Sequence, residues 1–127
     1  MEWLKITTNS EIIRIPTDEI IFIKGDGNYS DIFLANGKKE NVISQLHDLM
    51  DKLTALNYSP FCRVGKSLII NRDYIFKVNP GLQRIILSNS RFEKDILIKA
   101  SKDALKNLKE KLETEEELTL EKEGGNS

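Results

Sequence analysis

Short apolar runs separated by polar breaks fill the first third of the chain, a pattern typical of β-strands joined by turns. The pattern predicts strands at residues 11–15, 19–24, 29–34 and 38–43. Because Pro16 ends any helix between the first two strands, we expect those two to pair as a hairpin. Asn36 and Gly37 both tolerate positive φ, so we expect a tight hairpin between the last two.

Two amphipathic helices are expected, because apolar residues recur in two places at the spacing of one helix face. The first set is Leu46, Leu49, Met50 and Leu53, and the second is Ala104, Leu105, Leu108 and Leu112. Ser44 is placed to cap the first helix, and Ser101 is placed to cap the second.

A β-branched apolar run at residues 68–70 is followed at once by the turn residues 71–73, which predicts a short, fully buried strand. Further strands are expected at residues 74–78, 84–87 and 95–98, the last two paired as a hairpin. About eight short strands with two helices predict a mainly β, α+β domain.

The length of 127 residues fits one domain that buries a core without disulfides or metals. Cys62 has no second cysteine with which to form an internal disulfide. The first residues are too polar for a signal peptide, and no apolar run approaches the ~18 residues of a membrane helix. We therefore expect a soluble cytoplasmic protein that has no membrane partner.

The net charge of −1 conceals a marked asymmetry along the chain. Residues 61–112 carry twelve Lys and Arg against five Asp and Glu, whereas residues 113–127 carry six Glu and one Lys. A basic segment of this kind favours a polyanionic partner. We expect residues 1–112 to form the domain and residues 113–127 to be a disordered acidic tail, whose deletion leaves stability unchanged and tightens binding of such a partner.

Catalytic and metal-binding patterns are absent from the sequence. One histidine and one cysteine, on different predicted elements, give neither a nucleophile–base pair nor a zinc ligand set. Gly25 and Gly27 lack the third glycine of a dinucleotide-binding loop. Residues 26–31 begin like a calcium loop, but Asp31 stands where that loop needs glycine. We expect no enzymatic activity, no cofactor and no metal.

Three polar loops at predicted strand ends carry amides, hydroxyls and cations, the groups that bond phosphates and base edges. They lie at residues 25–30, 63–67 and 99–103. Each also has an ordinary structural explanation: Asn28 in a left-handed turn, Lys66 as a solvated cation, and Ser101 as a helix cap. Three such loops in one small domain, two of them in the basic segment, favour an anionic partner.

Two stretches resemble the LytTR-type DNA-binding domain of bacterial transcription regulators. They are Ile-x-x-Ile-x-Gly-Asp-Gly-Asn-Tyr at residues 20–29 and Phe-x-Arg-Val-Gly-Lys-Ser-Leu-Ile-Ile-Asn-x-x-Tyr-Ile at residues 61–75. The Arg-x-x-Lys-Ser-x-x-x-Asn core of the second stretch is the most specific part. Residues 97–102 resemble the family's last strand, which leads into a C-terminal helix. The match in order and spacing covers roughly residues 10–110.

This resemblance implies an elongated stack of small antiparallel sheets with two short helices, whose loops enter successive major grooves. The implied partner is double-stranded DNA at direct repeats in promoters, an arrangement that allows a homodimer on the DNA. Carried over by position, the DNA-binding residues are Asn28, Tyr29, Ser30, Arg63, Gly65, Lys66, Ser67, Lys99, Ser101 and Lys102.

The sequence departs from the family pattern in three respects. Gly65 stands where a His is common, which removes a possible base contact. Lys102 and Asp103 stand where Arg-Arg is common, which weakens bidentate recognition of guanine there. Most members also carry an N-terminal phosphoacceptor receiver domain, for which ten leading residues leave no space, so we expect either a stand-alone regulator or a fragment.

The leading hypothesis is a sequence-specific DNA-binding transcription regulator without catalysis. Its DNA-binding domain would be similar to the output domain of a response regulator. The alternative is a non-catalytic protein-interaction module that uses the same fold to antagonise a full-length regulator. The mixed-sign surface with a net charge of −1 keeps that alternative open. A gel shift against promoter fragments discriminates between the two.

Overall fold

The computed structural model describes residues 2–125, with side chains described as far as residue 115. Within this range the chain forms ten strands and two α-helices. In chain order the elements are β1 (Trp3–Thr7), β2 (Ile12–Pro16), β3 (Ile20–Asp26), β4 (Tyr29–Leu34), β5 (Lys39–Val42), α1 (Leu46–Thr54), β6 (Phe61–Val64), β7 (Leu68–Asn71), β8 (Ile75–Asn79), β9 (Arg84–Leu87), β10 (Ile96–Lys99) and α2 (Lys102–Gly125).

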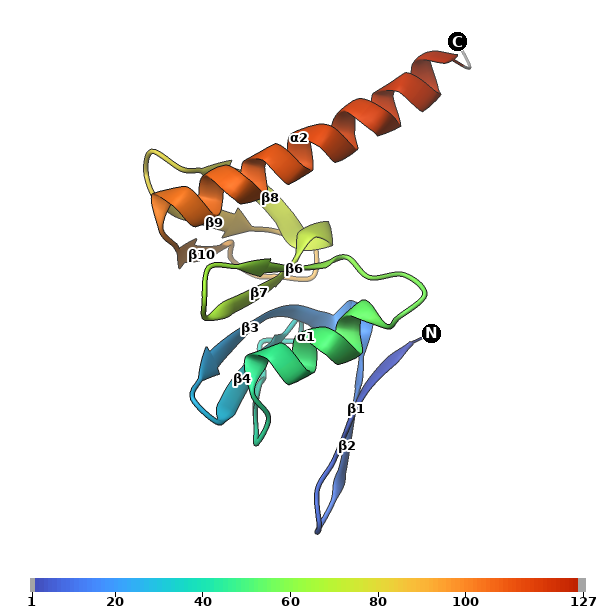
Figure 1. Cartoon of the computed structure of the whole chain (residues 1–127), viewed down its shortest axis with the longest axis vertical. Coiled ribbons are helices and arrows are strands. Elements are labelled where there is room, and N and C mark those ends of the chain that lie inside the picture. The colour runs from blue at the N-terminus through green and yellow to red at the C-terminus, as the bar shows by residue number, and fades with distance from the viewer. Residues whose placement is uncertain (1, 126–127) are drawn as a thin grey trace.

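All strand pairs are antiparallel, and they form three sheets (Figure 1). The central sheet has five strands in the order β5-β4-β3-β7-β6. A two-stranded sheet, β1-β2, and a three-stranded sheet, β10-β9-β8, complete the molecule. The prediction of a mainly β, α+β domain built from small antiparallel sheets is confirmed.

Strand β7 lies inside the central sheet, paired with β3 on one side and with β6 on the other. Because side chains alternate between the two faces of a sheet, Ile69 packs on one face and Leu68 and Ile70 pack on the other. All three side chains are buried. The buried strand predicted at residues 68–70 is therefore confirmed.

The central sheet separates two hydrophobic cores. The α1 core lies between the sheet, α1 and the β1–β2 hairpin, and Leu4, Leu49 and Leu53 are buried in it. The α2 core lies on the opposite face, where Leu87 of the three-stranded sheet packs with Leu105 of α2. The molecule is thus an elongated stack of layers, with α1 and α2 at different levels of it (Figure 1).

The N-terminal hairpin differs from the prediction. Strand β2 pairs with β1, which was not predicted, and not with β3. Apolar Leu4 and Ile6, two positions apart, form the alternating pattern in the sequence that could have predicted β1, and both side chains are buried. A 3₁₀ turn at Thr17–Glu19 carries the chain from this hairpin into the central sheet. Alternation of apolar residues specifies which face of a strand is buried, but it does not specify the partner strand.

Two local predictions also differ from the structure. Residues 61–64 form β6, although a loop was predicted to begin at residue 63. Ser44 does not cap α1: Gln45 is the residue before the helix, and its side chain makes no capping hydrogen bond. The carbonyl of Ser44 instead accepts a hydrogen bond from the hydroxyl of Ser30 at 2.7 Å, which ties the chain before α1 to β4.

Helix α2 does not end near residue 112 but continues to Gly125, a length of 24 residues. The sequence beyond residue 112 contains strong helix formers and no glycine or proline before Gly124, so a helix that has begun meets no stop signal. The division between domain and tail at residue 112 stays a prediction, and residues 126–127 lie outside the described residues. No helix within residues 2–125 is long and apolar enough to span a membrane.

Truncation after Leu112 is expected to change the free energy of unfolding by less than about 1 kcal/mol. Among the described side chains it removes two partly exposed ion pairs, Arg72–Glu115 and Lys109–Glu113, and such pairs contribute little. The acidic segment begins about 16 Å from the start of α2, because an α-helix rises about 1.5 Å per residue. The helix runs away from the loops predicted to bind DNA (Figure 1). Since that distance from the start of α2 exceeds the Debye length of about 8 Å at physiological salt, the acidic segment is screened from Lys99 and Lys102, and DNA affinity should also stay nearly constant.

Urea denaturation and fluorescence anisotropy with labelled DNA at physiological salt measure the two quantities. A marked rise in affinity after truncation would show that the acidic segment reaches the DNA-binding loops, as the sequence had suggested. A marked fall would show that it makes a contact that binding needs.

Candidate nucleic-acid interface

Two of the three predicted loops are neighbours at one end of the central sheet. The turn between β3 and β4 and the turn between β6 and β7 emerge on the same side, because Lys24 pairs with Leu68 in antiparallel register. The backbone N–H of Gly25 donates to the carbonyl of Ser67 at 2.8 Å, so the two turns are joined directly.

The third loop, which leads into α2, lies next to the β6–β7 turn. A Cβ placed on Gly65 would lie 3.7 Å from the Cβ of Ala104, in the first turn of α2. All three loops therefore lie along one long side of the molecule, at the left in Figure 1. We call this side the loop edge, and it comprises residues 26–29, 63–67 and 99–103.

The β6–β7 turn is shaped by its own sequence. Gly65 has a φ of +63°, a conformation that glycine adopts without steric cost. The guanidinium of Arg63 donates to the carbonyl of Lys66 at 2.6 Å and so holds the turn closed. The side chains of Lys66 and Ser67 are exposed. Arg63 thus has a structural role in the turn, while Lys66 presents a positive charge to solvent at its tip.

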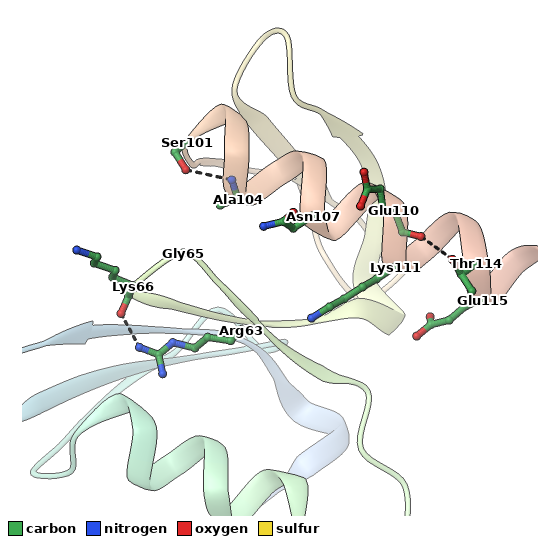
Figure 2. Close-up of a pocket in the computed structure, with 10 residues that line it drawn as sticks. All are labelled: Arg63, Gly65, Lys66, Ser101, Ala104, Asn107, Glu110, Lys111, Thr114 and Glu115. Atoms are coloured by element: carbon green, nitrogen blue, oxygen red, sulfur yellow. Dashed lines mark hydrogen bonds between the residues drawn. The ribbon is translucent and has the colours of Figure 1, made fainter.

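A groove of about 1060 Å³ separates the β6–β7 turn from α2. Figure 2 shows Arg63 and Lys66 on its strand side and Asn107 and Lys111 on its helix side. Asn107 and Lys111 were not among the predicted site residues. The available signal was their spacing from Ala104, since residues three and seven positions apart share one helix face.

The β3–β4 turn presents polar groups and one exposed carboxylate, that of Asp26. Gly27 has a φ of +61° and takes the left-handed position of the turn. Asn28 does not have positive φ, so the left-handed conformation suggested for it from the sequence is wrong. The Oδ1 atom of Asn28 accepts a hydrogen bond from Nε2 of Gln45 at 3.0 Å, which links the turn to the start of α1. Tyr29 is 48% exposed beside it. This turn offers an amide and a phenol to a partner.

Ser30 does not belong to the exposed surface, and its assignment as a DNA contact is corrected here. Its side chain is 0% exposed, and its hydroxyl donates to the carbonyl of Ser44. Ser30 follows the turn by two residues, and alternation along β4 points it into the sheet's α1 face while Tyr29 points outward. Through this hydrogen bond, Ser30 ties the start of β4, next to the β3–β4 turn, to the chain before α1.

The start of α2 combines a helix cap with exposed cations. The hydroxyl of Ser101 accepts a hydrogen bond from the N–H of Ala104 at 3.2 Å, so the predicted capping role is confirmed. Lys99 precedes the helix and Lys102 begins it, and both side chains are exposed. The positive charge of the loop edge is therefore concentrated in the β6–β7 turn and at this helix start.

Cys62 lies behind the loop edge and takes no part in its surface. The thiol is buried in the α2 core and donates to the carbonyl of Ile70 at 3.6 Å. Burial raises the pKa of the Cys62 thiol, which keeps it protonated and poorly nucleophilic at neutral pH. Within the described residues, no three His, Cys, Asp or Glu side chains are grouped so as to hold a metal ion.

Cationic and amide-bearing loops gathered along one edge offer the groups that bind phosphates and base edges of nucleic acid. The sequence model of the LytTr DNA-binding domain matches residues 10–113. The chain therefore belongs to the LytTR DNA-binding domain family.

A solved structure supports this fold assignment. The LytTr DNA-binding domain of a methyl-accepting/DNA response regulator from Bacillus cereus superposes with a TM-score of 0.60. The two chains share 14% sequence identity, and the similarity covers 88% of this chain and 97% of that one. No curated protein matches the chain in sequence.

Proposed function

We propose that the protein is a sequence-specific transcription regulator that inserts its loop edge into successive major grooves of promoter DNA. The observation that carries the proposal is the gathering of three polar loops, from two different layers of the fold, on one side of the molecule. Exposed Lys66 and Lys102 supply charge to phosphates, while Asn28 supplies an amide that pairs well with adenine. This function requires no catalysis, and it places the protein in the cytoplasm with the chromosome.

The proposed DNA target is a pair of direct repeats, with one copy of the protein on each repeat. The family resemblance suggests this arrangement, and the shape of the molecule supports it. The loop edge runs along the long axis of the stack, so one copy presents its three loops to one stretch of duplex (Figure 1). A second copy then binds the next repeat in the same orientation.

Replacing Lys66 or Lys102 with Ala is expected to weaken DNA binding. If each lysine contacts a phosphate, its loss lowers affinity on all sequences alike and reduces the slope of log K against log salt by about one. If Lys66 contacts a guanine edge instead, its loss costs about 1–3 kcal/mol and relaxes preference at one position only. Salt titrations by fluorescence anisotropy, on a selected site and on a scrambled one, distinguish these results.

Lys38→Ala is the matched control, because Lys38 is an exposed lysine at the opposite end of β4 from the β3–β4 turn. Its salt slope should equal that of the wild type. Full-strength binding by both Lys66→Ala and Lys102→Ala would refute the assignment of the loop edge. Absence of DNA affinity in the wild type at low salt would favour the protein-interaction alternative.

A further inference from the structure

The turn between β8 and β9 lies beside the start of α2 and is hydrogen-bonded to it. The N–H of Ala100, one residue before the Ser101 cap, donates to the carbonyl of Gln83 at 3.2 Å. Within the turn, the N–H of Gln83 donates to the carbonyl of Pro80, and the N–H of Leu82 donates to Oδ1 of Asn79. The turn is therefore an ordered element, fixed to a part of the loop edge.

Gln83 has an unusual backbone conformation. With a φ of 53°, it is the one residue other than glycine that has positive φ among residues 2–125. A side chain in this region of conformational space costs free energy, which glycine would avoid. Gly81 is two residues away, so the turn already contains the residue type that relieves such strain, but at another position. Strained positions of this kind concentrate where a side chain is needed for function.

The surface around Gln83 is open and positively charged. Gly81, Leu82, Gln83, Lys99 and Ala100 line a shallow hollow of about 570 Å³. The three strands of this sheet contain Lys77, Arg84 and Lys99 and no acidic residue. In Figure 1 the β8–β9 turn lies on the same side of the molecule as the loop edge, next to the first turn of α2.

We propose that the β8–β9 turn is a fourth DNA-contacting element, which binds the phosphodiester backbone just beyond the base pairs that the start of α2 contacts. The Gln83 amide and the Lys99 ammonium both donate hydrogen bonds that a phosphate oxygen accepts. This inference rests on the proposed function, and it extends the footprint of the protein past the three loops of the family resemblance.

A backbone contact is favoured over a protein partner by the placement of the turn. The Ala100–Gln83 hydrogen bond fixes the position of Gln83 relative to Lys102, so any duplex that meets Lys102 passes close to the turn. The charge of Lys99, with no acid on the neighbouring strands, suits a polyanion. The exposed Leu82, at 60%, is the one large apolar side chain of the turn, too small a surface for a stable protein contact.

The test combines variants of the turn with duplexes of different length. A selected site is prepared in a long duplex and in a series trimmed one base pair at a time from either end. Wild-type affinity should fall roughly three- to tenfold when trimming from one end removes the contacted phosphates. Gln83→Gly and Lys99→Ala should show a loss of that size on the long duplex, and trimming should then cost them little more.

Thermal unfolding separates a functional role of Gln83 from a structural one. Gln83→Gly should raise Tm by about 2–4 °C, because glycine adopts positive φ freely, and yet it should weaken DNA binding. Gln83→Asn, which tolerates positive φ and keeps a shorter amide, should recover part of the affinity. Lys38→Ala is again the control, since Lys38 is an exposed lysine that lies outside both the loop edge and the hollow.

Each outcome decides the inference. Equal affinity of wild type, Gln83→Gly and Lys99→Ala on every duplex would overturn it and leave the proposed function intact. A wild type that binds DNA but is insensitive to trimming from either end would do the same. A wild type without DNA affinity would overturn the proposed function, and this inference with it.

Discussion

Ile69→Ala is expected to lower the free energy of unfolding by about 2–5 kcal/mol. Ile69 is 0% exposed, and its strand is paired on both sides, opposite Ile23 and opposite Arg63. Its side chain fills the α1 core, where it packs with the leucines of α1. Truncation to Ala removes three carbons from a site walled by a sheet and a helix, which leaves little freedom for the cavity to close.

Urea denaturation of the wild type and the variant measures this loss. Ile43→Ala is the matched control, because Ile43 is 66% exposed just after β5 and its truncation should cost less than about 0.5 kcal/mol. A loss for Ile69→Ala as small as that of the control would show that β7 is not the central buried strand.

Asn71→Ala is expected to cost about 2–4 kcal/mol of stability. Asn71 is 2% exposed, and its amide nitrogen donates to the carbonyl of Ile20 at 2.8 Å. Its Oδ1 accepts from the N–H of Asp73 at 3.0 Å and so caps the 3₁₀ turn after β7. Alanine leaves the buried carbonyl of Ile20 without this donor and also removes the cap.

Asn41→Ala is a control of the same chemistry in an exposed place. The amide nitrogen of Asn41 donates to Oδ1 of Asp31 at 2.8 Å on the surface, where water replaces the lost bond, so stability should change by less than about 1 kcal/mol. Under conditions where Asn71→Ala is fully folded, its DNA affinity should equal that of the wild type, because the Asn71 side chain is buried inside the protein. Unequal affinity would instead give Asn71 a place in the interface.

Local chemistry in the sequence was sufficient for much of the fold. The turn at Asn36–Gly37 joins β4 and β5 as predicted, and Gly37 has a φ of +87°. The apolar stripe of α1 is buried at Leu46, Leu49 and Leu53. The β9–β10 hairpin also pairs as expected. In each case the signal lies within a few residues, where propensity and periodicity act.

Features that depend on distant partners were not predictable in this way. The pairing of β2 with β1 depends on which strand meets it in three dimensions, and Ile-rich alternation is the same for either partner. Ser30 was taken for a contact because it is polar and adjoins a turn. Its burial is decided by the approach of the Ser44 carbonyl, fourteen residues later in the chain.

The candidate site was predictable as separate loops but not as a surface. Lys66 and Lys102 lie 36 positions apart in the sequence, and the contact between Gly65 and the first turn of α2 brings their loops together. No pattern in the sequence pointed to Gln83 as a site residue, because the positive φ that distinguishes it is a property of the folded turn.

The two separate cores fix the distances between the three loops of the loop edge. The β3–β4 and β6–β7 turns are held by one sheet, whose strands are spaced about 4.8 Å apart, whereas the start of α2 is held by the next layer, about 10 Å away. The side chains of the α2 core therefore set how far apart the loops lie, and in the proposed complex they set the spacing of the contacted segments independently of which bases are contacted. Enlarging a residue of that core, such as Val64, should shift the preferred spacing between contacted segments while leaving the preference within each segment intact. If the loops contact DNA as proposed, target sequence is adjusted through exposed loop residues and target spacing through buried residues of the α2 core.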